Sequence, residues 1–404
     1  MTEALPPAIW AKRADLVALV KALGAGNARY VGGAVRDTLL GIAVKDIDIA
    51  TPIEPREVMR RLKVAGIRVI PTGIDHGTVT ALLDGGPVEI TTLRHDVSTD
   101  GRRATIAFAS EWQDDAARRD FTINALYADP ATGEVFDYFG GMDDLTARRV
   151  RFIGDAAQRI REDHLRILRY FRFQARFGSQ PADPASENAC AELAATLKGL
   201  SRERVGMEIF NLLALPDPAP TIARMAELGV LGVILPEADP KPLVSLVIEE
   251  RRQDVTPDPL RRLAALLPTD AELAGQVAAR FRLSGAQKKR LMSAAGRDPT
   301  PSPETQSSVA QQERASPSHQ ARALAYRLGM EQALDRLLLT GTEIAPLIGW
   351  TIPTFPLKGG EIVARGVKAG PEVARILQAV EASWVAEGFP GERRVDTMLA
   401  EALA

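Results

Sequence analysis

The sequence predicts an α+β protein in which a head with a small mixed or antiparallel sheet is followed by an all-helical remainder. Three observations lead to this prediction. Short β-like runs separated by turns are confined to about the first 150 of the 404 residues. From about residue 153 onward, Ala-, Leu-, Arg- and Glu-rich segments with helical periodicity replace them. The composition, with 46% hydrophobic and 25% charged residues, is that of an ordinary globular protein.

Local patterns predict the elements of the head in order. A helix is expected where apolar residues recur at helical spacing before a glycine, and strands where short apolar runs end at turn residues. Asp84–Pro87, between two β-like runs, favours an antiparallel hairpin. The expected elements are a helix over 9–23, a β-like run ending at 31, a helix-like segment over 35–41, and β-like runs over 47–51, 76–83 and 88–93.

Composition and charge exclude several classes of protein. No apolar run approaches the roughly 18 residues of a membrane-spanning helix, and the N-terminus does not resemble a secretory signal. The single cysteine, Cys190, excludes an intramolecular disulfide and disfavours a cysteine-based zinc site, so we expect a cytoplasmic protein. The net charge of −2 does not indicate a nucleic-acid partner, so any basic surface must be local. Residues 298–319, rich in Pro, Ser and Gln, are expected to form an exposed loop or linker.

A pair of carboxylates is the strongest local feature. Residues i and i+2 of a strand face the same side, so Asp46 and Asp48 should project together while Ile47 and Ile49 point into the core. Two adjacent carboxylates repel each other, and a hard divalent cation such as Mg²⁺ would supply the missing charge. The alternative is a solvent-facing acidic pair on an edge strand.

Two glycines precede this pair. Gly32 and Gly33 follow a β-like run and open a helix-like segment that contains Arg36. Glycines at such a turn let backbone N–H groups approach a phosphate, and an arginine can add a bidentate contact. A tight turn with a structural arginine is the alternative. Because the acidic pair follows about ten residues later, the combination is typical of nucleotidyl transfer.

Two further segments combine acids with arginines. Arg118–Asn124 contains two arginines beside an aspartate, for which a surface ion-pair cluster is the alternative. Between residues 148 and 176, nine arginines stand against three acids, a net of +6. The apolar residues of 160–175 fall within one helical arc of about 100°, so we expect one helix with a buried face and an Asp/Arg face. A solvated helix face and an intrahelical Glu162–Arg166 pair are the alternatives.

In this order, the segments resemble the class II tRNA nucleotidyltransferase family, which includes CCA-adding enzymes and bacterial poly(A) polymerases. VGGAVRDTLLG and KDIDIAT resemble its phosphate loop and metal motif, RRDFTINAL its second motif, and EDHLRILRYFRF its nucleotide-template helix. SRERVGMEIFNLL resembles the helix that closes the neck, and PLKGGEIVARGVKAGPEVARIL resembles the tail. The clear similarity covers roughly residues 28–215.

The resemblance implies a fold and an activity. The fold is a polymerase-β-like nucleotidyltransferase head over residues 1–150, a helical neck over 151–215, and a helical body and tail over 216–404 that bind tRNA. The activity is template-independent addition of CCA to tRNA 3′ ends from CTP and ATP, with release of pyrophosphate. Two Mg²⁺ ions, about 3.5–4 Å apart, would assist the attack of the RNA 3′-hydroxyl on the α-phosphate. No membrane contact and no obligate protein partner are indicated.

The family motifs also imply roles for individual residues. Asp46 and Asp48 match the metal-binding catalytic pair, and Glu89 is a weaker candidate for a supporting carboxylate. Asp163 and Arg166 match the pair that reads the Watson–Crick edge of the incoming base, so the protein itself acts as the template. The full set of expected nucleotide contacts is Gly33, Arg36, Arg119, Asp163, Arg166, Arg169 and Arg172.

Other activities stay open at this point. The poly(A) polymerase branch usually carries a basic G-[KR]-[KR]-F signature after the metal strand, whereas this chain has Asp75-His76-Gly77, as in the CCA-adding branch. The alternatives are a poly(A) polymerase, an enzyme that adds only CC or only A, and an inactive RNA-binding scaffold. The intact Asp46 and Asp48 argue against the scaffold. Residues 93–103 are expected to form a mobile loop, which complete enzymes of the family use to switch from cytosine to adenine.

Overall fold

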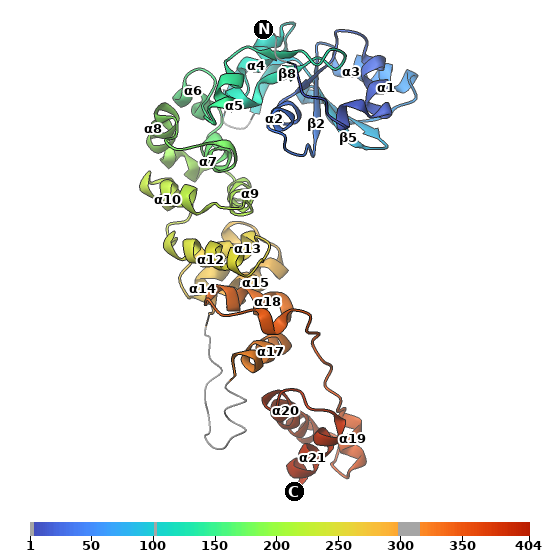
Figure 1. The fold of residues 1–404 in the computed structure, drawn as a ribbon, viewed down its shortest axis with the longest axis vertical. Coiled ribbons are helices and arrows are strands. Elements are labelled where there is room, and N and C mark those ends of the chain that lie inside the picture. Colours follow the sequence, from blue (N-terminus) through green and yellow to red (C-terminus); the bar gives the residue numbers. More distant parts are fainter. Residues whose placement is uncertain (1–3, 101–102, 298–315) are drawn as a thin grey trace. The chain divides into compact units, whose positions relative to one another are not determined.

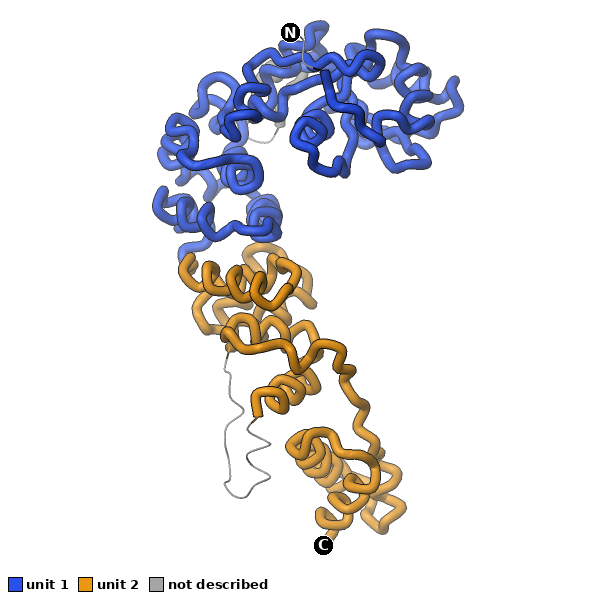
Figure 2. The backbone as a smooth tube through the Cα atoms, in the orientation of Figure 1, with its two compact units in different colours: residues 1–236 blue, residues 237–404 orange. Residues whose placement is uncertain are grey.

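The computed structural model describes residues 4–100, 103–297 and 316–404. The chain divides into two compact units, residues 1–236 and 237–404, which Figure 2 shows in different colours. The predicted boundaries at 150 and 215 both fall inside the first unit, so the division into head, neck, and body with tail remains a prediction. Most of the predicted linker, residues 298–315, lies outside the described residues.

A seven-stranded mixed sheet forms the centre of the first unit, as Figure 1 shows. The strand order is β3-β4-β5-β2-β1-β8-β9, in which β2 and β5 run parallel and the other neighbours run antiparallel. The expected hairpin forms between β4 and β5, where Leu83 pairs with Gly86. The strands are β1 (Arg29–Val31), β2 (Ile47–Thr51), β3 (Arg68–Gly73), β4 (Thr78–Leu83), β5 (Gly86–Thr92), β8 (Leu126–Ala128) and β9 (Val135–Asp137). The predicted α+β class with a small mixed sheet is confirmed.

A separate two-stranded sheet follows β5. β6 (Arg94–Asp100) pairs antiparallel with β7 (Arg103–Phe108). The prediction of a loop over 93–103 was therefore wrong for the described part of this segment, and residues 101 and 102 lie outside it.

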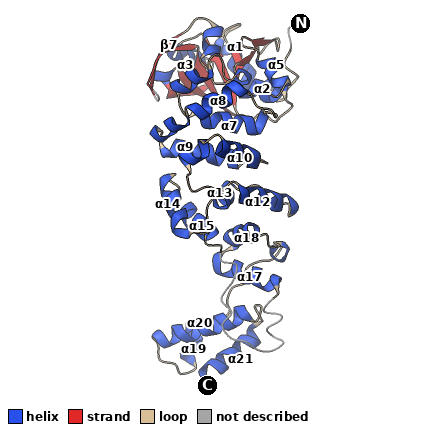
Figure 3. Ribbon diagram, turned by 90° about the vertical axis from the view of Figure 1, so that its left-hand side faces the viewer, coloured by secondary structure: helices blue, strands red, loops and turns tan. Residues whose placement is uncertain are grey.

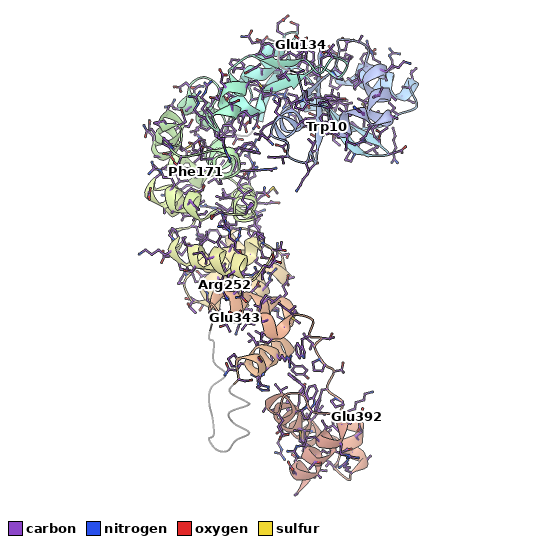
Figure 4. The ribbon with its side chains drawn as sticks, viewed as in Figure 1. Trp10, Glu134, Phe171, Arg252, Glu343 and Glu392 are labelled. Atoms are coloured by element: carbon purple, nitrogen blue, oxygen red, sulfur yellow. The ribbon has the colours of Figure 1, made fainter. Side chains whose placement is uncertain are left out.

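Helices cover the sheet of the first unit. α2 packs against β1, β2 and β8, whereas α1 contacts α3, and α3 contacts β3 and β4. The expected helix over 9–23 is shorter, because Arg13 is extended (ψ 127°) and only a 3₁₀ turn, Trp10–Lys12, precedes it. The helices are α1 (Ala14–Leu23), α2 (Gly33–Leu39), α3 (Pro55–Val64), α4 (Trp112–Ala117) and α5 (Gly141–Thr146). Trp10, labelled in Figure 4, packs edge-to-face on Tyr30 at 4.7 Å between ring centroids.

The rest of the first unit is helical, and all named strands of the described chain lie within residues 29–137 (Figure 3). The helices are α6 (Ala156–Glu162), α7 (Arg166–Phe177), α8 (Pro184–Glu192), α9 (Arg202–Leu213), α10 (Ala219–Glu227) and α11 (Val230–Ile234). Aromatic rings hold α7 against the preceding chain, since Phe121 lies 5.0 Å from both Phe152 and Phe173 between ring centroids. α7 also packs against α9 and α10.

The second unit contains helices only among its described residues. They are α12 (Lys241–Arg252), α13 (Pro259–Leu266), α14 (Ala271–Arg280), α15 (Gly285–Ala295), α17 (Pro317–Leu328), α18 (Met330–Leu339), α19 (Gly359–Ala364), α20 (Pro371–Ala386) and α21 (Glu392–Leu403). An apolar cluster around the buried Trp384 joins α17 and α19–α21. Arg252, at the end of α12, forms a 2.6 Å ion pair with Glu343, and both residues are labelled in Figure 4.

A buried charged network joins α12, α13, α15 and α18. Glu250 accepts hydrogen bonds from Arg261 at 2.7 Å and from Arg262 at 2.8 Å. Asp335 accepts from Arg261 at 2.9 Å and from Arg290 at 2.6 Å. Glu250, Arg262 and Asp335 are each at most 1% exposed, so these charges depend on one another rather than on water.

No helix among the described residues is long and apolar enough to cross a membrane.

Candidate active site

Asp46 and Asp48 lie at the centre of the sheet. β2 runs between β5 and β1, and Asp48 is in register with Glu89 of β5. β2 begins at Ile47, so Asp46 lies directly before the strand rather than within it. Asp46 is exposed and Asp48 is half-buried, whereas Ile47 and Ile49 are buried, as the alternation predicted.

The carboxylates around Asp48 influence one another. Burial, together with the nearby charges of Glu89 and Asp46, raises the pKa of Asp48 to about 6, while Arg119 opposes the rise. A divalent cation here would relieve the repulsion, and carboxylate oxygens are the donors that hard cations prefer. Among residues 4–100, 103–297 and 316–404, no three His, Cys, Asp or Glu side chains form a metal-binding group. The carboxylate oxygens of Asp46 and Asp48 are of the kind that a hard cation prefers, and a metal ion bound to them remains a prediction.

The turn between β1 and α2 requires glycine at its first position. Gly32 has φ 68° and ψ −120°, a backbone conformation that strains any residue with a Cβ atom. A Cβ atom at Gly32 would also lie 3.4 Å from Nη1 of Arg119 and 3.5 Å from the carbonyl oxygen of Asn124. Gly33 begins α2, and the nearest atom to an added Cβ there is Nη2 of Arg36, at 3.7 Å. This turn is therefore lined by arginine.

Arg36 is more deeply engaged in the protein than the sequence indicated. Its Nη1 donates to Oδ1 of Asn124 at 2.5 Å, and its Nε donates to Oδ1 of Asp37 at 2.8 Å. The guanidinium also lies 4.1 Å above the ring of Phe177, at the end of α7. With 6% of its surface exposed, Arg36 ties α2 to α7 in this structure. A phosphate contact from Arg36 remains a prediction.

Arg119 faces the glycine turn. Its Nε donates to the hydroxyl of Tyr127 at 3.1 Å, and its Nη2 lies 3.2 Å from Oδ2 of Asp115. Its Nη1 is the atom beside Gly32. The lowering effect of Arg119 on the pKa of Asp48 places its charge close to the carboxylates of the sheet. The structure thus brings the second motif next to the glycine turn and the acidic pair.

The expected single helix over 160–176 is interrupted. α6 ends at Glu162 and α7 begins at Arg166, because Asp163 adopts an extended backbone (φ −149°, ψ 106°). Its Oδ1 accepts the backbone N–H of Leu165 at 3.1 Å, a local hydrogen bond that competes with helix continuation. The prediction of one continuous helix was wrong. The apolar residues keep their spacing through the break, so periodicity alone did not reveal it.

The two predicted base-reading residues flank this break. Oδ2 of Asp163 accepts a hydrogen bond from Arg204 of α9 at 2.9 Å, and the side chain keeps 30% of its surface exposed. Arg166 forms a 2.7 Å ion pair with Glu162, which is the intrahelical pair that the sequence analysis gave as the alternative to a functional face. Arg166 also donates to the carbonyl oxygen of Arg118 at 3.2 Å. A contact with α9 therefore holds Asp163 in place, and a contact with the second motif holds Arg166 in place.

The arginines of α7 form ion pairs rather than a simple solvated face. Arg169 binds Oδ2 of Asp120 through Nε at 2.9 Å and Nη2 at 2.5 Å. Arg172 donates to Oε2 of Glu208 on α9 at 2.7 Å. Sequence reasoning noted Asp120 only as the aspartate beside Arg118 and Arg119, and it did not single out Asp115 or Glu208. The spacing of Asp115 to Arg119, four residues along a helix, was the available signal.

Comparison with known proteins identifies two matching family models. The Poly A polymerase head domain matches residues 28–151, and the probable RNA and SrmB-binding site of polymerase A matches residues 182–241. Among solved structures, a CCA-adding enzyme of Bacillus stearothermophilus in complex with CTP shares the fold, with a TM-score of 0.69 and 24% identity over 96% of both chains.

Curated relatives extend the similarity over most of the chain. The CCA-adding enzyme of Streptococcus sanguinis is 42% identical over 201 residues, 49% of this chain and 48% of the relative. The mitochondrial CCA tRNA nucleotidyltransferase 1 of Danio rerio is 35% identical over 369 residues, 88% of this chain and 83% of the relative. The protein of Homo sapiens with the same name is 34% identical over 378 residues, 90% of this chain and 84% of the relative. Identity of this extent is added to the glycine turn, the acidic pair and the second motif, which meet where β1 ends and β2 begins. The chain therefore belongs to the CCA tRNA nucleotidyltransferase family.

Proposed function

We propose that this nucleotidyltransferase adds C, C and A in turn to the 3′ end of tRNA, using CTP and ATP without a nucleic-acid template and releasing pyrophosphate. The observation that carries the proposal is the meeting of Asp48, Glu89 and Arg119 beside the Gly32 turn, in a chain whose relatives are CCA-adding enzymes. A triphosphate needs cationic and N–H donors, and its reaction needs a site for a divalent cation. Arg119 and the glycine turn support the first requirement, and the carboxylates of Asp48 and Glu89 support the second.

Enzymes of this family generally use divalent metal ions. We assign two Mg²⁺ ions to Asp46 and Asp48, with Glu89 as the supporting carboxylate in register with Asp48. When bound, such ions lower the pKa of an attacking hydroxyl and stabilise the charge on a departing pyrophosphate. Burial first, and then the charges of Glu89 and Asp46, raise the pKa of Asp48 to about 6, and such ions would balance these charges.

The remaining assignments divide nucleotide recognition between two regions. Gly33, Arg36 and Arg119 would receive the triphosphate, because they line the turn between β1 and α2 or bind next to it. Asp163 and Arg166 would read the base, with a carboxylate as acceptor and a guanidinium as donor. Arg169 and Arg172 would support them through their ion pairs with Asp120 and Glu208, as the contacts of α7 indicate.

The assignment of regions follows the same logic. We propose residues 1–150 as the catalytic head, 151–215 as the neck with the base-reading residues, and 216–404 as the body and tail that bind tRNA. No protein partner is needed for this scheme. A cytoplasmic location is part of the proposal, although the relatives from Danio rerio and Homo sapiens are mitochondrial proteins.

The test is incubation of the purified protein with tRNA that lacks its 3′-terminal CCA, with each nucleoside triphosphate alone and in combination. We expect CTP alone to extend the tRNA by two residues, and ATP to be added only after them. Asp48→Asn serves as the matched inactive control. Extension of unrelated RNA by many adenosines would indicate a poly(A) polymerase, and addition of only C or only A would indicate a partial enzyme. No incorporation by the wild type would overturn the proposal.

A further inference from the structure

Asp115, on α4, is the most contacted carboxylate near the proposed active site. Only 1% of its surface is exposed, yet four donors reach it. Arg118 binds Oδ1 through Nε at 2.8 Å, and the backbone N–H of Arg94, at the start of β6, approaches the same atom at 3.4 Å. Oδ2 accepts the hydroxyl of Tyr127 at 2.6 Å and lies 3.2 Å from Nη2 of Arg119. A carboxylate with this many donors stays ionised, and its pKa is lowered despite burial because the two arginines outweigh the loss of water.

Tyr127 completes the enclosure of Arg119 from a second direction. The tyrosine lies on β8, is fully buried, and packs against Trp112 with its ring centroid 5.9 Å away. Its hydroxyl donates to Asp115 and accepts from Nε of Arg119 at 3.1 Å. Burial raises the pKa of Tyr127, so the neutral hydroxyl can perform both roles. The orientation of Arg119 is thus set by a helix and a strand together.

The contacts leave one side of Arg119 available. Nε and Nη2 are held by Tyr127 and Asp115, whereas the neighbour of Nη1 is the turn at Gly32, where an added Cβ would be 3.4 Å away. Arg118 and Arg119 share the single carboxylate of Asp115. The guanidinium of Arg119 lies beside a glycine turn, and such a pairing favours an anion.

We propose that Asp115 and Tyr127 are positioning residues that fix Arg119 so that its free Nη1 edge receives a phosphate of the incoming nucleoside triphosphate. This inference rests on the proposed function, since it assumes that a triphosphate binds at the Gly32 turn. Neither Asp115 nor Tyr127 touches the nucleotide in this scheme. They act through Arg119, because an arginine whose four rotatable side-chain torsions were free would otherwise lose entropy on each binding event.

The experiment measures the affinity of the full-length protein for CTP by isothermal titration calorimetry in the presence of Mg²⁺, without tRNA. We expect Tyr127→Phe to weaken CTP binding roughly fivefold, and Asp115→Asn roughly tenfold or more, the loss typical of hydrogen bonds to neutral and charged partners. Tyr127→Phe removes one hydroxyl and keeps the ring, so the fold is retained. The KM for tRNA, measured in the extension assay, should change less than twofold.

A double-mutant cycle tests whether the effect passes through Arg119. In an Arg119→Ala background, Tyr127→Phe and Asp115→Asn should weaken CTP binding no further, because the group that they position is gone. Asp335→Asn is the matched control, since it removes another buried carboxylate that binds two arginines but lies in the second unit. It should lower stability and leave the affinity for CTP unchanged.

Three results would overturn the inference. The first is an unchanged CTP affinity in Tyr127→Phe. The second is that Tyr127→Phe and Asp115→Asn weaken CTP binding as much in the Arg119→Ala background as in the wild type. The third is that Asp335→Asn weakens CTP binding as much as these variants do. Failure of the proposed function is recognised separately. A wild type that binds CTP with the expected mutant pattern but extends no tRNA would contradict CCA addition while supporting the positioning role.

Discussion

Replacing Asp120 by asparagine should destabilise the first unit in a pH-dependent way. Oδ2 of Asp120 accepts two hydrogen bonds from Arg169, and Oδ1 accepts the amide of Asn124 at 2.9 Å and the backbone N–H of Phe121 at 2.9 Å. The side chain is about one-tenth exposed, so water can replace little of what is lost. The substitution keeps the shape of the side chain and removes its charge.

The magnitude follows from the pKa of Asp120. Burial alone would raise this pKa, but the charge of Arg169 and the hydrogen bonds from Asn124 and Arg169 lower it from 3.8 to about 2. Because the folded-state pKa is depressed, the carboxylate stabilises the fold at pH values above about 4, and this contribution is lost as the pH falls through about 2. The difference between the folded-state and the ordinary pKa of Asp120 corresponds to roughly 2 kcal/mol of unfolding free energy at pH 7 and to about half of that at pH 3.

The assay is urea unfolding of the full chain at pH 7 and pH 3, with pulse-labelling hydrogen exchange of peptides from α7 to follow the first unit. Asp120→Asn should lose roughly 2 kcal/mol at pH 7 and about 1 kcal/mol at pH 3. Asp143→Asn is the control, because Asp143 is exposed on α5, and it should change stability by less than about 0.5 kcal/mol. An equal loss at the two pH values would refute the reasoning, since it would assign the effect to packing rather than to the charge.

Four further predictions concern the proposed activity. Asp46→Asn or Asp48→Asn should abolish addition of both C and A while tRNA binding, measured by filter retention, is kept; a parallel loss of binding would contradict the metal assignment. Asp163→Ala or Arg166→Ala should slow addition and also admit UTP and GTP, because a site that hydrogen-bonds a base edge rejects the wrong base by leaving buried groups unpaired; unchanged discrimination would remove the template role. The logarithm of tRNA affinity should fall linearly with the logarithm of salt concentration, as phosphate contacts release counterions, and a salt-insensitive affinity would indicate another mode of recognition. Replacing residues 95–102 by a short Gly/Ser linker should leave CC addition largely intact and impair the terminal A, whereas equal loss of both steps would exclude a switching role.

The sequence was informative where a short pattern determines a local structure. The alternation around Asp48 predicted the buried Ile47 and Ile49, and the turn residues at 84–87 predicted the hairpin between β4 and β5. The helical periodicity after residue 153 predicted the all-helical remainder. In each case the spacing of the apolar residues and the turn residues favour the same local structure, so the sequence predicts only one.

The sequence was less informative where distant residues decide the outcome. The break between α6 and α7 depends on Asp163, whose carboxylate is held by Leu165 within the turn and by Arg204, 41 residues later. Arg36 was expected at a phosphate, but its place against Phe177 depends on a contact across 141 positions that periodicity cannot show. The arginine-rich segment was predicted to have an Asp/Arg face, and only the fold reveals which acids bind which arginines.

The buried charged network of the second unit limits how this part of the protein can change its sequence. Asp335 is one of two carboxylates that bind Arg261 and one of three that bind Arg290, and Glu250 is the other carboxylate that binds Arg261. Replacing Asp335 or Glu250 alone therefore leaves the buried network with an excess of positive charge, which is strongly destabilising, although a complete apolar replacement of such networks is often neutral or stabilising. We therefore expect the charged version of this core to be separated from an apolar one by unstable single substitutions. Laboratory evolution by one substitution at a time should thus leave these five positions unchanged, whereas a library that varies them together can cross between the two.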